Sequence, residues 1–238
     1  MIPRGAGQPL AGGALVAWAL ALAACGGGDP SPLPPNLTIT GQDTGPARGP
    51  ITFSFTFSED VGNSFTSADV VISAGNKASF SKLSPGQYTL VVTPPAGTRG
   101  SLELSVAADA YSSLATRLPG AEAARFSQAF DTQAPSLAIS SSAAGRVAQT
   151  AFTLIFNFSE DVGSSFTADD VQLLFSSGSG GAKGNFNRVS ATQATLDVLL
   201  PAGAAGVVDL SVGAGAFFDL AGNVSTAAYF AAQQFDTR

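Results

Sequence analysis

The sequence predicts an all-β fold built as two tandem β-sandwich domains. Composition is one reason: 27 glycines and 14 prolines favour many turns, and only 12% of the residues are charged, so exposed strand faces must consist largely of Ser, Thr, Asn and Gln. Periodicity is a second reason, because apolar and polar residues alternate in several short runs. The third is an internal repeat: Phe57–Gly62 returns unchanged as Phe158–Gly163, 101 positions later and one domain length away.

Residues 1–24 are predicted to be a lipoprotein signal peptide. Arg4 supplies a positive start, and residues 14–24 form an apolar run of about 11 residues, whereas a membrane-spanning helix needs about 20. The Leu-Ala-Ala-Cys run at 22–25 resembles the lipobox at which bacterial lipoproteins are cleaved and lipidated. Cys25 is the only cysteine, and lipidation explains a thiol without a disulfide partner. The alternatives are ordinary secretion with cleavage nearby and a free or intermolecular thiol.

Residues 25–35 are predicted to be a flexible tether that begins with the lipidated Cys25 and continues with Gly and Pro. Two or three acyl chains would hold the protein stably on a membrane. By the resemblance to bacterial lipoproteins, Gly26 in place of an aspartate indicates the outer membrane if the source is Gram-negative. Periplasmic location and surface exposure both stay open.

The first domain is predicted to span residues 36–132. Its alternating runs indicate seven short strands, at 37–40, 51–57, 70–73, 79–83, 88–92, 102–106 and 126–130. Seven strands in about 95 residues are typical of an immunoglobulin-like sandwich. A domain of this size can fold without a disulfide or a metal. The order of the strands is left open.

The second domain is predicted to span residues 133–238, with corresponding strands at 152–158, 194–198 and 208–212. The spacing between equivalent positions grows from 101 to 106, since the second copy has about five extra residues in the loop at 176–183.

From Asn36 to Thr237 the chain resembles tandem bacterial Ig-like repeats, which occur in exported surface proteins and adhesins. Four motifs carry the resemblance. They are Phe-Ser-Glu-Asp-Val-Gly in both copies, the Phe-Thr-Ser-Ala-Asp-Val run at 65–70 with its equivalent Phe-Thr-Ala-Asp-Asp-Val at 166–171, Asp-Leu-Ala-Gly-Asn at 219–223, and Phe-Asp-Thr-Gln-Ala-Pro at 130–135. The first copy departs from the pattern with Ser-Leu-Ala-Thr-Arg at 113–117. A site that depends on that turn is therefore not expected in the first copy.

Composition excludes several kinds of function. The chain has no histidine, which removes His-dependent triads and His-ligated metal sites. Without Arg4 it carries 17 acidic and 10 basic residues, and it has no basic run. Nucleic acid is therefore not an expected partner.

The paired carboxylates Glu59-Asp60 and Glu160-Asp161 lie at the same place in each copy. They permit three interpretations: a catalytic acid pair, a calcium site at a loop end, or a solvated turn that ends the strand. Adjacent strand residues point to opposite faces, and an enzyme rarely needs the same pair twice, so we predict no catalytic residue.

A calcium site is the metal-binding hypothesis. Its candidate ligands are Glu160, Asp161, Asp219, Asn223 and, from the linker, Asp131, because hard cations prefer oxygen ligands. The alternative is that Gly222 merely allows a tight turn.

Two runs with Thr-x-x-Asp spacing predict N-terminal helix caps. They are Thr66 to Asp69 and Thr167 to Asp170.

The expected function is that of a lipid-anchored, non-catalytic protein of the cell envelope, which binds a protein or glycan or acts as a spacer. The alternatives are a calcium-stiffened stalk without a ligand of its own and a carbohydrate-binding accessory of an envelope hydrolase. No cofactor other than calcium is expected.

Overall fold

A computed structural model describes residues 31–41 and 45–238. The predicted signal peptide, Cys25 and most of the tether lie outside these residues. Within the described residues, no helix is both long and apolar enough to cross a membrane.

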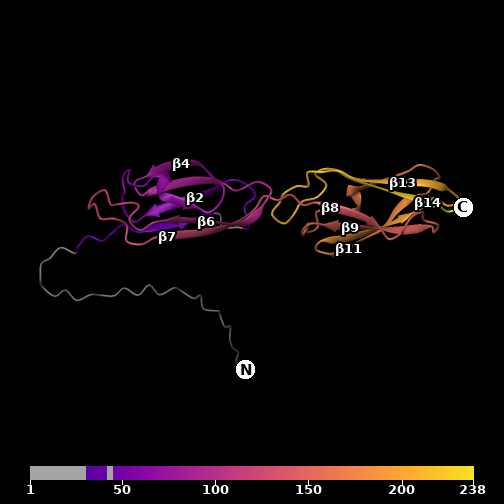
Figure 1. Cartoon of the computed structure of the whole chain (residues 1–238), viewed down its shortest axis with the longest axis horizontal. Coiled ribbons are helices and arrows are strands. Elements are labelled where there is room, and N and C mark those ends of the chain that lie inside the picture. The colour runs from indigo at the N-terminus through magenta and orange to yellow at the C-terminus, as the bar shows by residue number, and fades with distance from the viewer. Residues whose placement is uncertain (1–30, 42–44) are drawn as a thin grey trace, which may run out of the picture. The chain divides into compact units, whose positions relative to one another are not determined.

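The first sandwich contains seven antiparallel strands in two sheets. The strands are β1 (Leu37–Thr40), β2 (Ile51–Phe57), β3 (Val70–Ile72), β4 (Asn76–Ser84), β5 (Gln87–Thr93), β6 (Arg99–Val106) and β7 (Ala124–Asp131). One sheet has the order β1-β2-β5-β4 and the other β3-β6-β7. Figure 1 shows β2 and β4 in one layer and β6 and β7 in the other. This is the strand order of a constant-type immunoglobulin domain, which the sequence left open.

The second sandwich repeats this arrangement. Its strands are β8 (Leu137–Ser141), β9 (Ala151–Phe158), β10 (Val171–Phe175), β11 (Ala182–Ser190), β12 (Gln193–Leu199), β13 (Ala205–Val212) and β14 (Tyr229–Asp236). The sheets have the orders β8-β9-β12-β11 and β10-β13-β14. The repeated motif also occupies the same place in the pairing, since Phe57 pairs with Leu37 and Phe158 pairs with Leu137. The predicted all-β fold with two Ig-like sandwiches is confirmed.

Each sandwich has its own core, as the period-two pattern predicts. In β2 and β9 every second side chain is buried, and the intervening ones are exposed or half-buried. The two clusters of buried side chains, 39–130 and 137–235, share no residue. A phenylalanine lies at the same place in each, Phe65 against Phe57 and Phe166 against Phe158, with ring centroids 4.9 and 5.0 Å apart.

The segment after the first strand of each sandwich crosses to the opposite sheet. Ala47 forms a parallel bridge with Phe130, and Val147 forms one with Phe235. Both crossing residues are buried at 1% exposure. The crossing covers part of the last strand's free edge, which would otherwise present unpaired backbone groups.

Both predicted caps are present. Thr66 and Thr167 begin short 3₁₀ helices, Ser67–Asp69 (η1) and Ala168–Asp170 (η2), and each forms a capping box. The Asp69 and Asp170 carboxylates accept hydrogen bonds of 2.7 Å from the backbone N–H of their cap threonines. These aspartates serve the turn that leads into β3 and β10.

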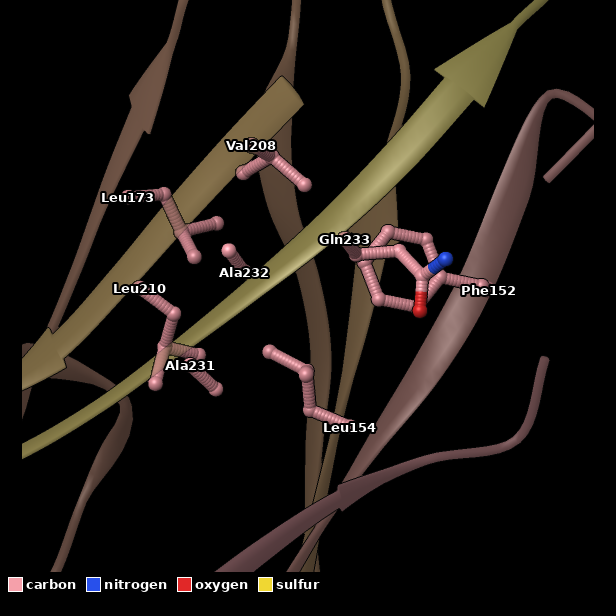
Figure 2. A pocket seen from close by; sticks show the side chains of 8 residues that line it. All are labelled: Phe152, Leu154, Leu173, Val208, Leu210, Ala231, Ala232 and Gln233. Carbon is pink, nitrogen blue, oxygen red and sulfur yellow. The ribbon is translucent and has the colours of Figure 1, made fainter. Parts of the chain in front are cut away.

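The cores differ in one packing detail. In the first sandwich Phe126 packs edge-on against Phe53, with ring centroids 6.0 Å apart. The strand pairing places Leu154 at the position equivalent to Phe53 in the second sandwich, and Ala231 at the position equivalent to Phe126. A void of about 20 Å³ remains between β9 and the β13–β14 pair. Figure 2 shows the side chains that line it. The second core is therefore less completely filled near Ala231.

Candidate cation site at the start of the second sandwich

Glu160 and Asp161 follow the end of β9 after one intervening residue, and the chain turns there so that their carboxylates have different neighbours. Asp161 Oδ1 accepts a hydrogen bond of 2.8 Å from the Gly163 N–H and lies 3.6 Å from Arg188 Nη2. The left-handed φ of 51° at Gly163 allows this tight turn. Asp161 thus stabilises the turn, and Glu160 is left to face the linker.

Asp219 lies in the loop between β13 and β14, which is closed by the bridge between Phe218 and Val224. Its two carboxylate oxygens accept hydrogen bonds of 2.8 Å from the backbone N–H and the side-chain amide of Asn223. Asp219 is only 3% exposed. The loop therefore holds a buried carboxylate in a fixed orientation, and Gly222 supplies the left-handed φ of 89° that the turn needs.

Asp131 ends β7 and brings a carboxylate from the first sandwich. Its Oδ1 accepts a hydrogen bond of 3.0 Å from the Gln133 N–H. The Asn223 side-chain amide donates to the Asp131 carbonyl oxygen at 3.0 Å. A second contact between the sandwiches is the 2.8 Å hydrogen bond from Arg48 Nη1 to the Gly222 carbonyl oxygen. The residues from Leu33 to the C-terminus form one unit, in which these contacts join the sandwiches directly.

Three carboxylates meet at this junction. Asp131, Glu160 and Asp219 each offer an oxygen, and these oxygens all lie within 4.8 Å of one another. They line a shallow pocket together with Pro46, Arg99, Asp161, Leu220 and Ala221.

The electrostatics of the cluster are unfavourable for Glu160. Its side chain is only 9% exposed, and Oε1 has no hydrogen-bond partner among the described residues. Burial, followed by the negative charges of Asp131 and Asp219, raises the pKa of Glu160, and Arg99 opposes this rise. A buried carboxylate oxygen without a partner costs free energy unless a cation compensates it.

The donor set fits a hard divalent cation. Calcium takes six to eight oxygen ligands in flexible geometry, and these include carboxylates, carbonyls and water. Asp131, Glu160 and Asp219 would supply the protein oxygens, and water would supply the remainder. Asn223 would orient the Asp219 carboxylate through a hydrogen bond of 2.8 Å, and it would hold the Asp131 backbone nearby through the carbonyl oxygen.

The structure therefore brings together four of the five residues that the sequence singled out for calcium. Asp131, Glu160 and Asp219 form the cluster, and Asn223 is bound to two of them. Asp161 borders the pocket but is not part of the group of three. Arg99 and Arg48 also lie at this place, and no sequence motif marks them, because only strand pairing and loop contacts bring them there.

The equivalent place in the first sandwich has a neutral side chain where the second sandwich has the Asp219 carboxylate. Glu59 Oε2 accepts a hydrogen bond of 2.5 Å from Ser113 Oγ, where the second copy has Asp219. Asp60 makes the same turn as Asp161, with a 2.8 Å hydrogen bond from the Gly62 N–H and an ion pair with Lys82. A neutral serine thus replaces one carboxylate, as the departure in the first copy predicted.

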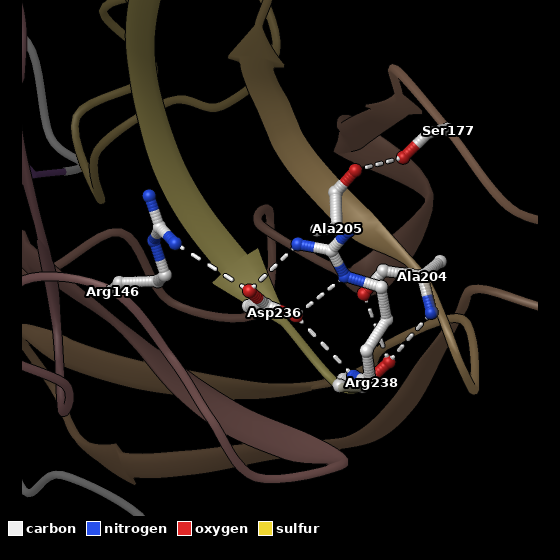
Figure 3. Close-up of polar contacts among 7 residues, drawn as sticks. Arg146, Ser177, Ala204, Ala205, Asp236 and Arg238 are labelled. Carbon is white, nitrogen blue, oxygen red and sulfur yellow. Dashed lines mark hydrogen bonds and ion pairs between the residues drawn. The ribbon is translucent and has the colours of Figure 1, made fainter.

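The counterpart of Asp131 at the end of the second sandwich is Asp236. It is bound by Arg238 at 3.0 Å and by Arg146 at 3.4 Å, as Figure 3 shows. The hydrogen bonds from Arg238 lower the pKa of Asp236 to about 2. At this end of the chain arginines neutralise the aspartate, whereas at the junction two further carboxylates surround it.

Comparison with known proteins agrees with the fold. Residues 32–127, which contain most of the first sandwich, match a family model described as a bacterial Ig-like domain. The first sandwich is similar to that family. No curated protein matches the chain.

Several solved structures share some likeness with the chain. Yersinia pseudotuberculosis InvD is 14% identical over 84% of this chain and 57% of that one, with a TM-score of 0.39. The Yersinia pseudotuberculosis adhesin InvE is 13% identical over 84% of this chain and 58% of that one, with a TM-score of 0.31. The chain thus spans less than two thirds of either structure.

Proposed function

We propose that this protein is a non-catalytic spacer of the cell envelope whose two Ig-like sandwiches are clamped at their junction by calcium. The observation that carries the proposal is the carboxylate of Glu160, which is nine-tenths buried and lies beside Asp131 and Asp219. One of its oxygens accepts no hydrogen bond from any residue that the structure describes. A cation there would bind ligands from both sandwiches at once. Because Asp131 ends the first and the other two lie in the second, binding would restrict motion at the linker.

Calcium titration tests the proposal. Calorimetry of the wild-type protein is expected to show heat of binding, and calcium at 100 times its dissociation constant should stabilise the protein by about 2.7 kcal/mol. Glu160→Gln and Asp219→Asn should each remove most of the effect. Glu59→Gln is the matched control, since it makes the same change at the equivalent place in the first sandwich. Absence of both heat and a raised melting temperature in the wild type would refute the clamp.

The membrane anchor is a separate part of the proposal and depends on Cys25, which lies outside the described residues. Its support is the lipobox-like run that ends in the only cysteine of the chain. Mass analysis of the membrane-retained peptide should show acylated Cys25, and Cys25→Ser should release the protein into the soluble fraction. Protease treatment of intact cells would show whether the sandwiches face outward or into the periplasm.

A ligand-binding face is the second candidate function. On the outer face of the β10-β13-β14 sheet, Leu174 is 69% exposed and Phe230 is 77% exposed. The first sandwich has Ser73 and Arg125 at the corresponding positions. Leu174 and Phe230 border the same pocket together with polar residues, and contiguous exposed apolar patches with a polar rim are typical of binding surfaces.

The test of this second candidate is a double variant that copies the first sandwich. Leu174→Ser with Phe230→Arg is expected to abolish retention of the protein on a glycan array or on host-cell surfaces while leaving its melting temperature within a few degrees. Unchanged retention would exclude this face, and absence of retention in the wild type would leave the spacer as the sole candidate.

A further inference from the structure

Arg99 lies beside the junction cluster at a position that strand pairing determines. It begins β6 and is the direct cross-strand partner of Asp131 in the β6–β7 register. Its Nη1 lies 3.8 Å from Glu160 Oε2. Its side chain is 62% exposed, in contrast to the buried Glu160, so the guanidinium approaches the carboxylates from the solvent side.

The charge balance of the cluster leaves room for a further cation. Three carboxylates carry a formal charge of about −3, and Arg99 reduces this to about −2. Within residues 31–41 and 45–238, no other Lys or Arg nitrogen lies within 4.0 Å of these three carboxylates. The 3.8 Å separation between Arg99 Nη1 and Glu160 Oε2 exceeds hydrogen-bond distance, and Glu160 Oε1 has no hydrogen-bond partner in the described part of the chain.

We propose that Arg99 is an internal counter-ion of the junction site, which competes with calcium for Glu160 and sets the calcium affinity. Without calcium, Arg99 offsets part of the repulsion among Asp131, Glu160 and Asp219. When calcium binds, the guanidinium is repelled by the ion and turns outward, which its exposure permits. This inference rests on the proposed calcium site and concerns how tightly that site binds.

Coulomb's law gives the expected size of the effect. A unit charge about 6 Å from a divalent ion, in a medium close to water, changes the affinity on the order of tenfold, and salt reduces this. Arg99→Gln is therefore expected to lower the calcium dissociation constant by about three- to tenfold. Removal of a merely structural ion pair would instead leave the calcium affinity unchanged or weaken it.

The experiment uses calorimetric titration with calcium chloride and thermal unfolding of the full protein, with and without a chelator. Arg99→Gln should bind calcium more tightly but melt at a lower temperature than the wild type in chelator. The control is Arg125→Gln, which removes the same charge six positions from Asp131 on β7, about 20 Å away along the strand and beyond the screening length. This control should leave both quantities unchanged.

The outcomes separate the two proposals. If the wild type does not bind calcium, the proposed function fails. If the wild type binds and Arg99→Gln binds equally or more weakly, the site is retained and the role of Arg99 is refuted. A lower melting temperature for Arg99→Gln in both calcium and chelator, with unchanged affinity, would also identify Arg99 as a structural residue only.

Discussion

Arg117 is the one described non-glycine residue with a left-handed backbone, at a φ of 64°. The length of the loop that contains Arg117 explains this conformation. Ser112 bridges Pro119 in the first sandwich and Phe218 bridges Val224 in the second, so the first loop is one residue longer. Arg117 therefore corresponds to Gly222, not to Asn223 as direct alignment of the two runs suggests. A residue with a Cβ atom therefore occupies a turn position that favours glycine.

Arg117→Gly should stabilise the first sandwich by about 0.5–1 kcal/mol, because relief of the left-handed strain outweighs the greater flexibility of the unfolded chain. Chemical denaturation measures this, with Arg125→Gly on β7 as a control that should destabilise. Equal loss of stability in both variants would show that the strain at Arg117 is negligible.

Protonation of the single residue Asp236 should make the stability of the protein depend on pH. Its pKa is lowered from 3.8 to about 2 by Arg238 and Arg146. A lowered carboxyl pKa contributes stability that is present above pH 3.8 and is lost as the pH falls towards 2. Between these values the wild type should lose more stability than Asp236→Asn. Parallel acid-denaturation curves for the two proteins would contradict this assignment.

At the scale of elements, the two sandwiches show how one topology tolerates different core packing. The β2 and β9 strands share their alternating burial, but the partners on β7 and β14 differ in size, with Phe126 in one and Ala231 in the other. The result is the void beside Ala231 (Figure 2). Pairing and alternation suffice to specify the fold, and close packing adds stability.

Ala231→Val should fill part of the void and stabilise the second sandwich by about 1 kcal/mol, because two methyl groups become buried and valine suits a strand. Phe126→Ala is the reciprocal change in the first sandwich and should cost about 2–3 kcal/mol. Thermal unfolding measures both changes. Destabilisation by Ala231→Val would mean that the void cannot accept the added volume.

At the scale of the whole molecule, two separate cores are joined by a linker with direct contacts and a carboxylate cluster. Because the cores share no residue, each sandwich should unfold as its own cooperative unit. Calcium would couple them, since its ligands come from both. Either sandwich would then release the ion when it unfolds.

Calorimetry in chelator should show two transitions, and Phe166→Ala should lower only one of them, by about 3–5 kcal/mol of stability. Calcium should raise both midpoints in the wild type. Asp131→Asn, a change in the first sandwich, should diminish the calcium-induced shift of the second. A full shift in Asp131→Asn would show that the linker aspartate is not a ligand.

The amino-acid sequence by itself determined the all-β class, the two copies and most strand positions, because alternation and turn residues are local properties of the chain. It also singled out Glu160 with Asp161 through the repeat, Asp219 with Asn223 through the Asp-Leu-Ala-Gly-Asn turn, and Asp131 through its place in the linker. Strand 79–83 was placed within a longer β4 (Asn76–Ser84), where two bulges interrupt the simple alternation.

Only the tertiary structure decided how these parts meet. The strand order depends on contacts between distant segments. So does the carboxylate cluster, whose members come from the end of β7, the turn after β9 and the β13–β14 loop. The position of Arg99 beside the cluster has the same origin. The same applies to the different roles of Glu160 and Asp161, adjacent in the chain but divided by one tight turn. Local sequence patterns specify strands and turns, whereas distances between charges follow from how those strands pair and pack.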